Sequence, residues 1–278
     1  LERHIKEYLA IRCGMQEVFN YPWMDEQFVN AVLQSTDGIL YLSTPPSPAE
    51  KYIRSSLLPN LCKDVVKNER YYSEFAIFET AQVFRDENYT SPYDEREKLP
   101  SQRKNVAGAF VSAAKDVTAL FRKAKGVIEM MPRYTHMEGF TFKQAEKPVW
   151  ADNVVWLNIY LGEEKVGDLA LLAKKVSMAC GIKNLNVMLF EIDQDALKPF
   201  KSRTNTFTHL AEFPMTDYDI SVLLDGEVQW KDVAQTIQGV KSELLHGAAF
   251  VDEYRGKQVP EGKKSMTVRL TIGAKDKT

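Results

Sequence analysis

Short strand-like segments interleave with helical segments at irregular spacing, and this pattern limits the folds that the chain can adopt. Aromatic and β-branched residues predict strands at residues 75–79, 81–84, 106–111, 140–142, 154–161 and 187–192. Apolar residues at three- to four-residue intervals predict helices at residues 2–19, 24–33, 49–68, 116–130 and 172–180. Gly14 interrupts or ends the first part of the first helix, and Pro59 is a position for a kink in the third. Irregular alternation of this kind favours an α+β fold with a mainly antiparallel sheet.

Two polar segments punctuate this pattern. Residues 86–104 are charged, contain proline and have no apolar period, so we expect an exposed, mobile loop there. Residues 193–209 contain Pro199 and a basic cluster, and they form the best linker candidate. We therefore predict a first domain at residues 1–195, a linker at 196–208 and a second domain at 209–278.

The second domain shows a different order of elements. Its pattern predicts a strand, a helix and two strands, at residues 219–224, 230–245, 248–254 and 265–272. This β-α-β-β order is the first two thirds of a ferredoxin-like α/β sandwich. The next helix and strand of such a unit do not occur before Thr278, so the predicted sandwich is incomplete.

Composition and charge exclude several classes of protein. The chain is 44% hydrophobic and 27% charged, which is typical of a globular protein with a buried core. It has neither an apolar run long enough to cross a bilayer nor an apolar signal core, so we expect a cytoplasmic protein without membrane contact. The formal net charge of -2 argues against a general polyanion binder and confines any nucleic-acid contact to a local patch. Cys13, Cys62 and Cys180 are far apart in apolar surroundings, which indicates reduced core thiols.

Motifs for catalysis or metal binding are weak. Ser112 and Lys115 have the Ser-x-x-Lys spacing, but the companion elements of that motif are absent. Residues 256–265 differ from a phosphate-binding loop, because five residues separate the glycines and a strand is expected to follow. The acidic pairs and the four histidines have no metal spacing. We therefore predict no catalytic residue and no metal site in this chain.

Several stretches of sequence nevertheless resemble one family, the β chain of phenylalanyl-tRNA synthetase, over nearly the whole chain. The longest, at residues 252–265, is almost gapless and specific. The matching stretches are RCGMQEV at 12–18, RSSLLPNL at 54–61 with the later Asn68, FE at 78–79, VF at 83–84, FP at 213–214, DISV at 219–222 and DEYRGKQVPEGKKS at 252–265.

The resemblance implies a fold and partners. It implies the C-terminal part of the β chain: a catalytic-like domain with a class II synthetase-like antiparallel sheet, then a ferredoxin-fold anticodon-binding domain. The expected partners are an α chain, in an α2β2 assembly, and tRNA, but not DNA. ATP and magnesium are used by the whole ligase, and this part is expected to bind no cofactor. Arg54 and the helix around Leu57, Leu58 and Leu61 could be core, or could bury a face against the α chain, and the resemblance implies the latter for some of them.

The chain also departs from the motifs that class II catalysis needs. Those motifs are an arginine in a strand-loop-strand segment, which clamps the ATP α-phosphate, and a later Gly-x-Gly-x-x-x-Arg strand and helix. Arg85 is near the first position, but the return strand lacks the matching glutamate and the second motif is absent. This agrees with the family, whose β chain carries a catalytic-like domain without chemistry. Tyr218 replaces the arginine that the family usually has there, which weakens the case for a contact from that position.

A basic segment in the second domain is the candidate RNA site. We predict that Tyr254, Arg255, Lys257, Lys263 and Lys264 bind the anticodon region of tRNA. The open face of a ferredoxin-like sheet can stack unpaired bases on aromatic rings while cations hold phosphates. Residues 255–264 carry a local charge of +3, whereas residues 209–278 hold nine basic and eleven acidic residues. The alternative is a solvated hairpin turn without a ligand.

Two other functions are compatible with the residues. One is a stand-alone class II-like ligase that acts on a small molecule, and it requires an ATP site. The other is a metabolite-binding ferredoxin-like module, which predicts small-ligand binding to residues 209–278 and indifference to tRNA.

Overall fold

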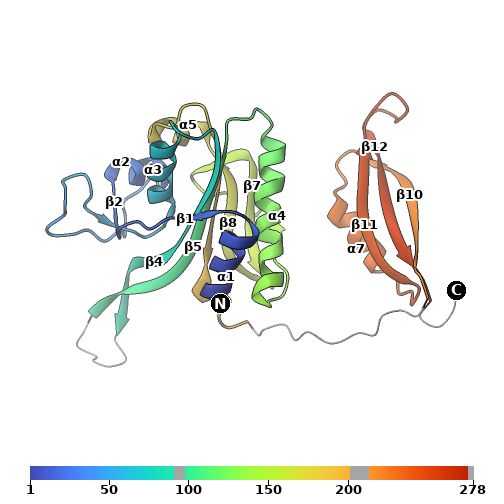
Figure 1. Ribbon diagram of the computed structural model, residues 1–278, viewed down its shortest axis with the longest axis horizontal. Coiled ribbons are helices and arrows are strands. Elements are labelled where there is room, and N and C mark those ends of the chain that lie inside the picture. The colour runs from blue at the N-terminus through green and yellow to red at the C-terminus, as the bar shows by residue number, and fades with distance from the viewer. Residues whose placement is uncertain (91–97, 201–212, 275–278) are drawn as a thin grey trace. The chain divides into compact units, whose positions relative to one another are not determined.

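The computed structural model describes residues 1–90, 98–200 and 213–274, and the chain divides into two compact units. The first unit covers residues 1–204 and the second covers residues 205–278. Each unit is built on its own main sheet, one of seven strands and one of three (Figure 1). The domain and linker boundaries that we set at residues 195 and 209 stay predictions.

The seven-stranded sheet has the order β1-β4-β5-β9-β8-β7-β6 and is antiparallel except for the pair β1 and β4. A separate two-stranded sheet pairs β2 with β3. The strands of the first unit are β1 (Gln16–Glu17), β2 (Trp23–Met24), β3 (Tyr52–Ile53), β4 (Glu74–Thr90), β5 (Lys98–Ser112), β6 (Thr141–Lys143), β7 (Ala151–Leu161), β8 (Glu164–Leu172) and β9 (Asn186–Asp193).

Part of the predicted mobile loop is strand. The pairing of β4 with β5 continues from Glu74 and Ser112 out to Thr90 and Lys98, so most of residues 86–104 extends the hairpin; residues 91–97 lie outside the described residues. Backbone hydrogen bonds form this extension, and its charged sequence has no apolar alternation from which it could be predicted. The strand β8 was also missed, because its apolar end merges with the helix that follows.

The helices of the first unit differ from the prediction mainly in where they begin and end. The first ends at Arg12, just before Gly14, whose φ of +67° is not helical. The third begins at Leu58 rather than at residue 49, so Pro59 lies in its first turn and causes no kink. The helices are α1 (Glu2–Glu7), the π-helix η1 (Tyr8–Arg12), α2 (Glu26–Val32), α3 (Leu58–Asn68), α4 (Val117–Thr135), α5 (Lys174–Cys180) and α6 (Gln194–Leu197).

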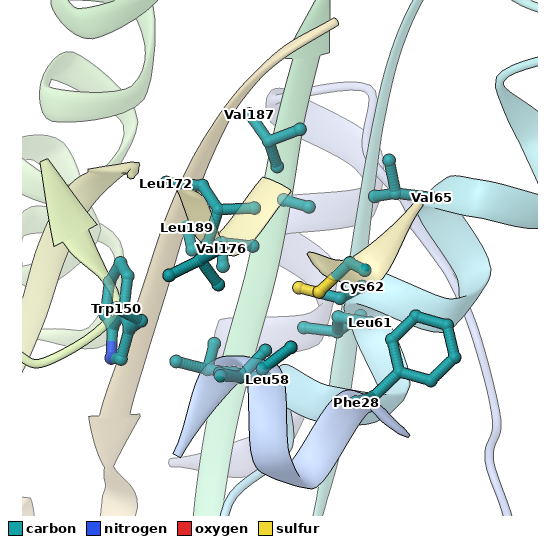
Figure 2. Packing of buried hydrophobic residues seen from close by; sticks show 14 of the residues in the cluster. Phe28, Leu58, Leu61, Cys62, Val65, Trp150, Leu172, Val176, Val187 and Leu189 are labelled. Atoms are coloured by element: carbon teal, nitrogen blue, oxygen red, sulfur yellow. The ribbon is translucent and has the colours of Figure 1, made fainter. Parts of the chain in front are cut away.

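Two apolar clusters cover the two faces of this sheet. Helices α2, α3 and α5 pack on one face, and α1, α4 and α6 pack on the other (Figure 1). Figure 2 shows Leu58, Leu61 and Cys62 of α3 in one cluster with Leu189 of β9. Cys62 and Cys180 are buried in this cluster, and all three cysteines are free, as predicted.

The second unit has the predicted β-α-β-β order, but its helix ends at Gln238 instead of residue 245. Its antiparallel sheet has the order β10-β12-β11, so β10 lies at an edge. The elements are β10 (Thr216–Asp225), α7 (Trp230–Gln238), β11 (Leu245–Tyr254) and β12 (Lys263–Ile272). None of the helices in the described part of the chain has the length and apolar character needed to span a bilayer.

Candidate functional site

The five residues that we predicted to bind RNA lie on one hairpin, but they do not form one surface. Tyr254 ends β11 and pairs with Ser265, while Lys263 and Lys264 begin β12. Successive residues of a strand point to opposite faces. Tyr254 and Lys263 therefore lie on one face of the sheet, and Lys264 lies on the other, on which α7 packs.

Most of the positive charge of this hairpin is paired within the protein. Arg255 Nε lies 2.8 Å from Glu253 Oε1, and Lys264 Nζ lies 2.8 Å from the other oxygen of the same carboxylate. The hydrogen bond from Lys264 and then that from Arg255 lower the pKa of Glu253. Lys263 Nζ lies 2.7 Å from Asp225 Oδ1. Because Lys264 is only 5% exposed, it does not belong to the RNA-facing surface that we expected, and the remaining assignments stay predictions.

The tyrosine of the hairpin has a defined position. Tyr254 is 47% exposed, and its ring lies against the backbone of Gly256. A Cβ atom on residue 256 would be 2.3 Å from Tyr254 Oη, so glycine at this position allows the ring to lie there. The position leaves nearly half of the side chain accessible, as stacking on a base requires.

The sheet face opposite α7 is acidic, which the sequence did not reveal. Arg269 on this face forms two hydrogen bonds with Asp219, at 2.7 and 2.8 Å. Strand register places four aspartates and two cations there: Asp217, Asp219, Asp225, Asp252, Lys263 and Arg269. Aspartates repel phosphate, so this face as a whole does not match the basic, aromatic platform that we predicted.

The face on which α7 packs contains an apolar groove of about 360 Å³. Every second residue along parts of β10 and β12 is aliphatic and faces the groove, and residues of α7 line the groove as well. Its apolar lining comes from Ile220, Val222, Leu224, Val228, Val233, Ile237, Val268 and Leu270. The ferredoxin-like resemblance implies a second helix on such a sheet, and the groove is the part of this face that α7 leaves uncovered.

Two arginines, Arg85 and Arg103, lie on the paired strands β4 and β5, and Arg85 is exposed. The strand β9 leads into α6, where Asp193 caps the helix by accepting hydrogen bonds from two backbone N–H groups. Asp193 Oδ2 also lies 2.6 Å from Arg103 Nε. An acidic residue paired with a cation from β5 thus occupies the corner between β9 and α6.

A carboxylate on β9, which the motif search missed, holds the start of α3 against the sheet. Glu191 Oε1 accepts hydrogen bonds from the backbone N–H of Leu57 and from Asn105 Nδ2, both at 2.9 Å. Ser56 Oγ donates to Glu191 Oε2 at 2.6 Å and accepts from the N–H of Leu58 at 3.1 Å. Burial raises the pKa of Glu191. The serine before a helical pattern was the available sequence signal for this helix start.

The four residues that we considered for a subunit interface lie inside this chain. Leu57, Leu58 and Leu61 are at most 2% exposed and belong to the core on the α3 face of the sheet. Arg54 is 8% exposed, donates from Nε to the carbonyl of Gln82 at 2.6 Å and contacts Glu79 Oε1 at 3.2 Å. These three leucines are buried in this chain, because α3 needs its apolar face to pack on its own sheet, and their assignment to a subunit interface stays a prediction.

No cluster of three or more metal-ligating side chains is found in the described residues. The side chains of Glu191, Ser56 and Asn105 bind one another or bind the backbone at the start of α3. These contacts anchor the start of the helix to the sheet.

Comparison with known proteins gives a consistent result for both units. Residues 1–194 match the model of the phenylalanyl tRNA synthetase beta chain CLM domain, and residues 211–278 match the model of the ferredoxin-fold anticodon binding domain. The phenylalanine–tRNA ligase beta subunit of Oceanobacillus iheyensis is 28% identical over 97% of this chain, and that of Carboxydothermus hydrogenoformans is 25% identical over 97%. The chain spans about a third (34%) of the length of these two relatives.

A solved structure supports the fold of the first unit. The pyrrolysyl-tRNA synthetase of Desulfitobacterium hafniense aligns with 71% of this chain and 66% of its own, with a TM-score of 0.55 and 13% identity. At that identity the likeness concerns the fold alone, and it agrees with the class II synthetase-like sheet that we predicted.

Proposed function

Because the chain belongs to the family of phenylalanyl-tRNA synthetase β chains, we propose that it is the C-terminal portion of the β subunit of a phenylalanine–tRNA ligase. The whole ligase attaches phenylalanine to its tRNA with ATP and magnesium. The observation that carries this proposal is the order of the two matched domains, with a CLM domain followed by an anticodon-binding domain. We place the enzyme in the cytoplasm.

In this proposal the first unit supports assembly with the α chain in an α2β2 enzyme and performs no chemistry. The match of residues 1–194 to the beta chain CLM domain supports this role. The carboxylate of Glu191 on β9 is engaged by three donors of this chain. The sequence has no Gly-x-Gly-x-x-x-Arg motif, and the corner of β9 and α6 holds the Asp193–Arg103 ion pair.

Assembly is tested by co-expressing the chain with the α chain of a phenylalanine–tRNA ligase and measuring the mass of the purified product by light scattering. We expect one species that contains both chains, whereas the α chain alone is the control. Two separate species contradict the subunit proposal. The purified chain should also show no ATP–pyrophosphate exchange with phenylalanine, and robust exchange without an α chain favours a stand-alone ligase.

The second unit binds the anticodon region of tRNA in this proposal. Tyr254 and Lys257 support that role, because Tyr254 is half exposed and Lys257 is exposed and outside the ion pairs of the hairpin. A labelled anticodon stem-loop is titrated against the assembled enzyme. Tyr254→Phe should keep the affinity, and Tyr254→Ala should cost about 1 to 3 kcal/mol of binding free energy. Unchanged affinity in Tyr254→Ala and Lys257→Ala contradicts this assignment.

A further inference from the structure

A solvent-exposed aromatic pair lies where α3 turns into β4, far from the hairpin in sequence. Tyr71 and Tyr72 are 65% and 59% exposed. Their backbone N–H groups both donate to the carbonyl of Asn68, at 2.9 and 3.1 Å, and this fixes the turn. The two rings lie 6.4 Å apart, and the ring of Tyr72 meets that of the half-buried Phe75 edge-on at 6.4 Å. The turn therefore holds two large aromatic side chains in solvent-exposed positions.

One cation contacts this pair, and two more belong to segments whose backbone joins the same turn. The guanidinium of Arg70 lies 4.7 Å from the centre of the Tyr71 ring. Lys183 is linked to the same turn, because its N–H donates to Glu69 Oε2 at 3.2 Å. The segment that carries Lys115 adjoins the turn, since the N–H of Ala113, two residues before Lys115, donates to the carbonyl of Ser73 at 2.9 Å. We call Arg70, Tyr71, Tyr72, Lys115 and Lys183 the tyrosine corner.

The charges of the tyrosine corner are free, unlike those of the hairpin. Arg70, Lys115 and Lys183 are exposed, and none of them forms an ion pair with any residue in the described ranges. The neighbouring acids are engaged elsewhere: Glu69 by the backbone of Lys183, Glu74 by Lys123 at 3.2 Å, and Asp116 by the first N–H groups of α4. Glu69 and Asp116 keep their negative charge in these hydrogen bonds, so the three cations of the corner exceed the two carboxylates that pair with no cation in the described residues. The corner thus combines exposed rings with a small excess of positive charge.

We propose that the tyrosine corner is a second RNA contact, which stacks an unpaired base on Tyr71 or Tyr72 and holds the adjoining phosphates with its three cations. Stacked bases and phosphate contacts are how proteins bind single-stranded RNA without sequence preference. The corner places exposed tyrosine rings beside cations, the combination on which single-stranded nucleic acids stack their bases and hold their phosphates. The choice of RNA as the ligand rests on the proposed function, but the site is on a different unit from the anticodon-binding one.

The test uses the full chain and a labelled oligoadenylate of about ten nucleotides, a length within the usual site size. Fluorescence anisotropy at two salt concentrations gives the affinity and its salt dependence. The double variant Tyr71→Ala/Tyr72→Ala should bind about 5- to 150-fold more weakly for each stacked base lost, and Tyr71→Phe/Tyr72→Phe should bind like the wild type. Arg70→Gln/Lys183→Gln should reduce the log–log salt slope by about 0.7 for each cation removed.

Matched controls separate a local effect from a general one. Tyr41→Ala removes a tyrosine that is 75% exposed elsewhere on the first unit, and Lys174→Gln removes an exposed lysine of α5; both should leave affinity and slope unchanged. The proposal is overturned if the wild-type chain does not bind the oligoadenylate. It is also overturned if the alanine double variant binds like the wild type, or if the phenylalanine double variant loses as much affinity as the alanine one.

Two further outcomes distinguish this proposal from the proposed function. If Tyr254→Ala weakens binding of the anticodon stem-loop while the tyrosine-corner variants leave oligoadenylate binding unchanged, the corner is wrong and the anticodon assignment stands. If the tyrosine-corner variants impair assembly with the α chain and not RNA binding, the corner is a protein interface and the proposal is rejected.

Discussion

Replacing Glu191 tests whether its carboxylate anchors α3 to the sheet. Glu191→Ala removes the acceptor of three donors, of which the hydroxyl of Ser56 and the amide of Asn105 can rotate toward other partners. The backbone N–H of Leu57 cannot rotate, and a buried unsatisfied donor costs about 1 to 3 kcal/mol. Because the rotated groups recover only part of their hydrogen bonding, we expect the alanine variant to lose about 2 to 4 kcal/mol of unfolding free energy.

Glu191→Gln has the same shape and separates the charge from the hydrogen bonds. Its carbonyl oxygen can accept from Leu57 and Asn105, and its NH₂ group can donate to Ser56 Oγ. The hydroxyl of Ser56 loses its acceptor, while the folded state no longer has to bury a charge. These effects oppose each other, so the glutamine variant should stay within about 1 kcal/mol of the wild type at neutral pH.

The raised pKa of Glu191 also predicts how the difference in unfolding free energy between Glu191→Gln and the wild type changes with pH. Burial raises the pKa of Glu191 in the folded state, and the nearby Asp168 adds to this rise. Below the unfolded pKa the group is protonated in both states, so the stability that it contributes is fully present. As the pH increases, the unfolded chain releases the proton first, and the free energy of unfolding falls until the pH passes the folded pKa. Glutamine does not titrate, so the stability of Glu191→Gln relative to the wild type should rise from about pH 4 to about pH 7.

Urea unfolding followed by circular dichroism at both pH values measures these differences. Glu79, whose pKa burial also raises, titrates in both proteins and cancels in the comparison. Glu163→Gln, on a side chain that is 98% exposed, is the control and should show no such trend. The reasoning is refuted if Glu191→Gln is as unstable as Glu191→Ala, or if its difference from the wild type does not change with pH.

Three further predictions use the same unfolding assay or the RNA titration. Arg54→Met should cost about 3 to 5 kcal/mol, because it leaves the buried Glu79 without its counter-charge, and unchanged stability in urea contradicts this. Gly167→Ala should cost about 1 to 3 kcal/mol, since its Cβ would lie 2.3 Å from a carbonyl oxygen of β9; a wild-type urea midpoint excludes that clash. Lys264→Met should raise the pKa of Glu253 toward its ordinary value in an NMR titration, and leave the salt slope of RNA binding unchanged because Lys264 is buried. A slope that falls by about one would instead place this lysine on a phosphate.

The order of elements was predictable from the sequence because local patterns determine it. In the second unit, aliphatic alternation along β10 and β12 marks strands that face a helix, and the β-α-β-β order follows from it. The start of α3 was less predictable, because Ser56 and Leu57, just before it, are held by Glu191, which is distant in sequence. The extension of β4 and β5 was unpredictable from periodicity, since backbone pairing alone supports it.

The candidate RNA site shows why charge counted along a sequence is a poor guide to charge on a surface. The excess of +3 in the hairpin is lost because strand register brings Asp225 opposite Lys263, 38 residues away in sequence, and places Glu253 between Arg255 and Lys264. A charge count over a short stretch of sequence therefore cannot include the pair of Asp225 and Lys263.

The tyrosine corner is the opposite case, because its three segments are separate in sequence and none has a notable charge. Folding brings the segments of Arg70, Lys115 and Lys183 to one end of the sheet. Nearby, Glu74 pairs with Lys123, while Glu69 and Asp116 accept hydrogen bonds from backbone N–H groups. A binding surface for phosphate thus depends on which cations remain unpaired after the strands and helices have formed.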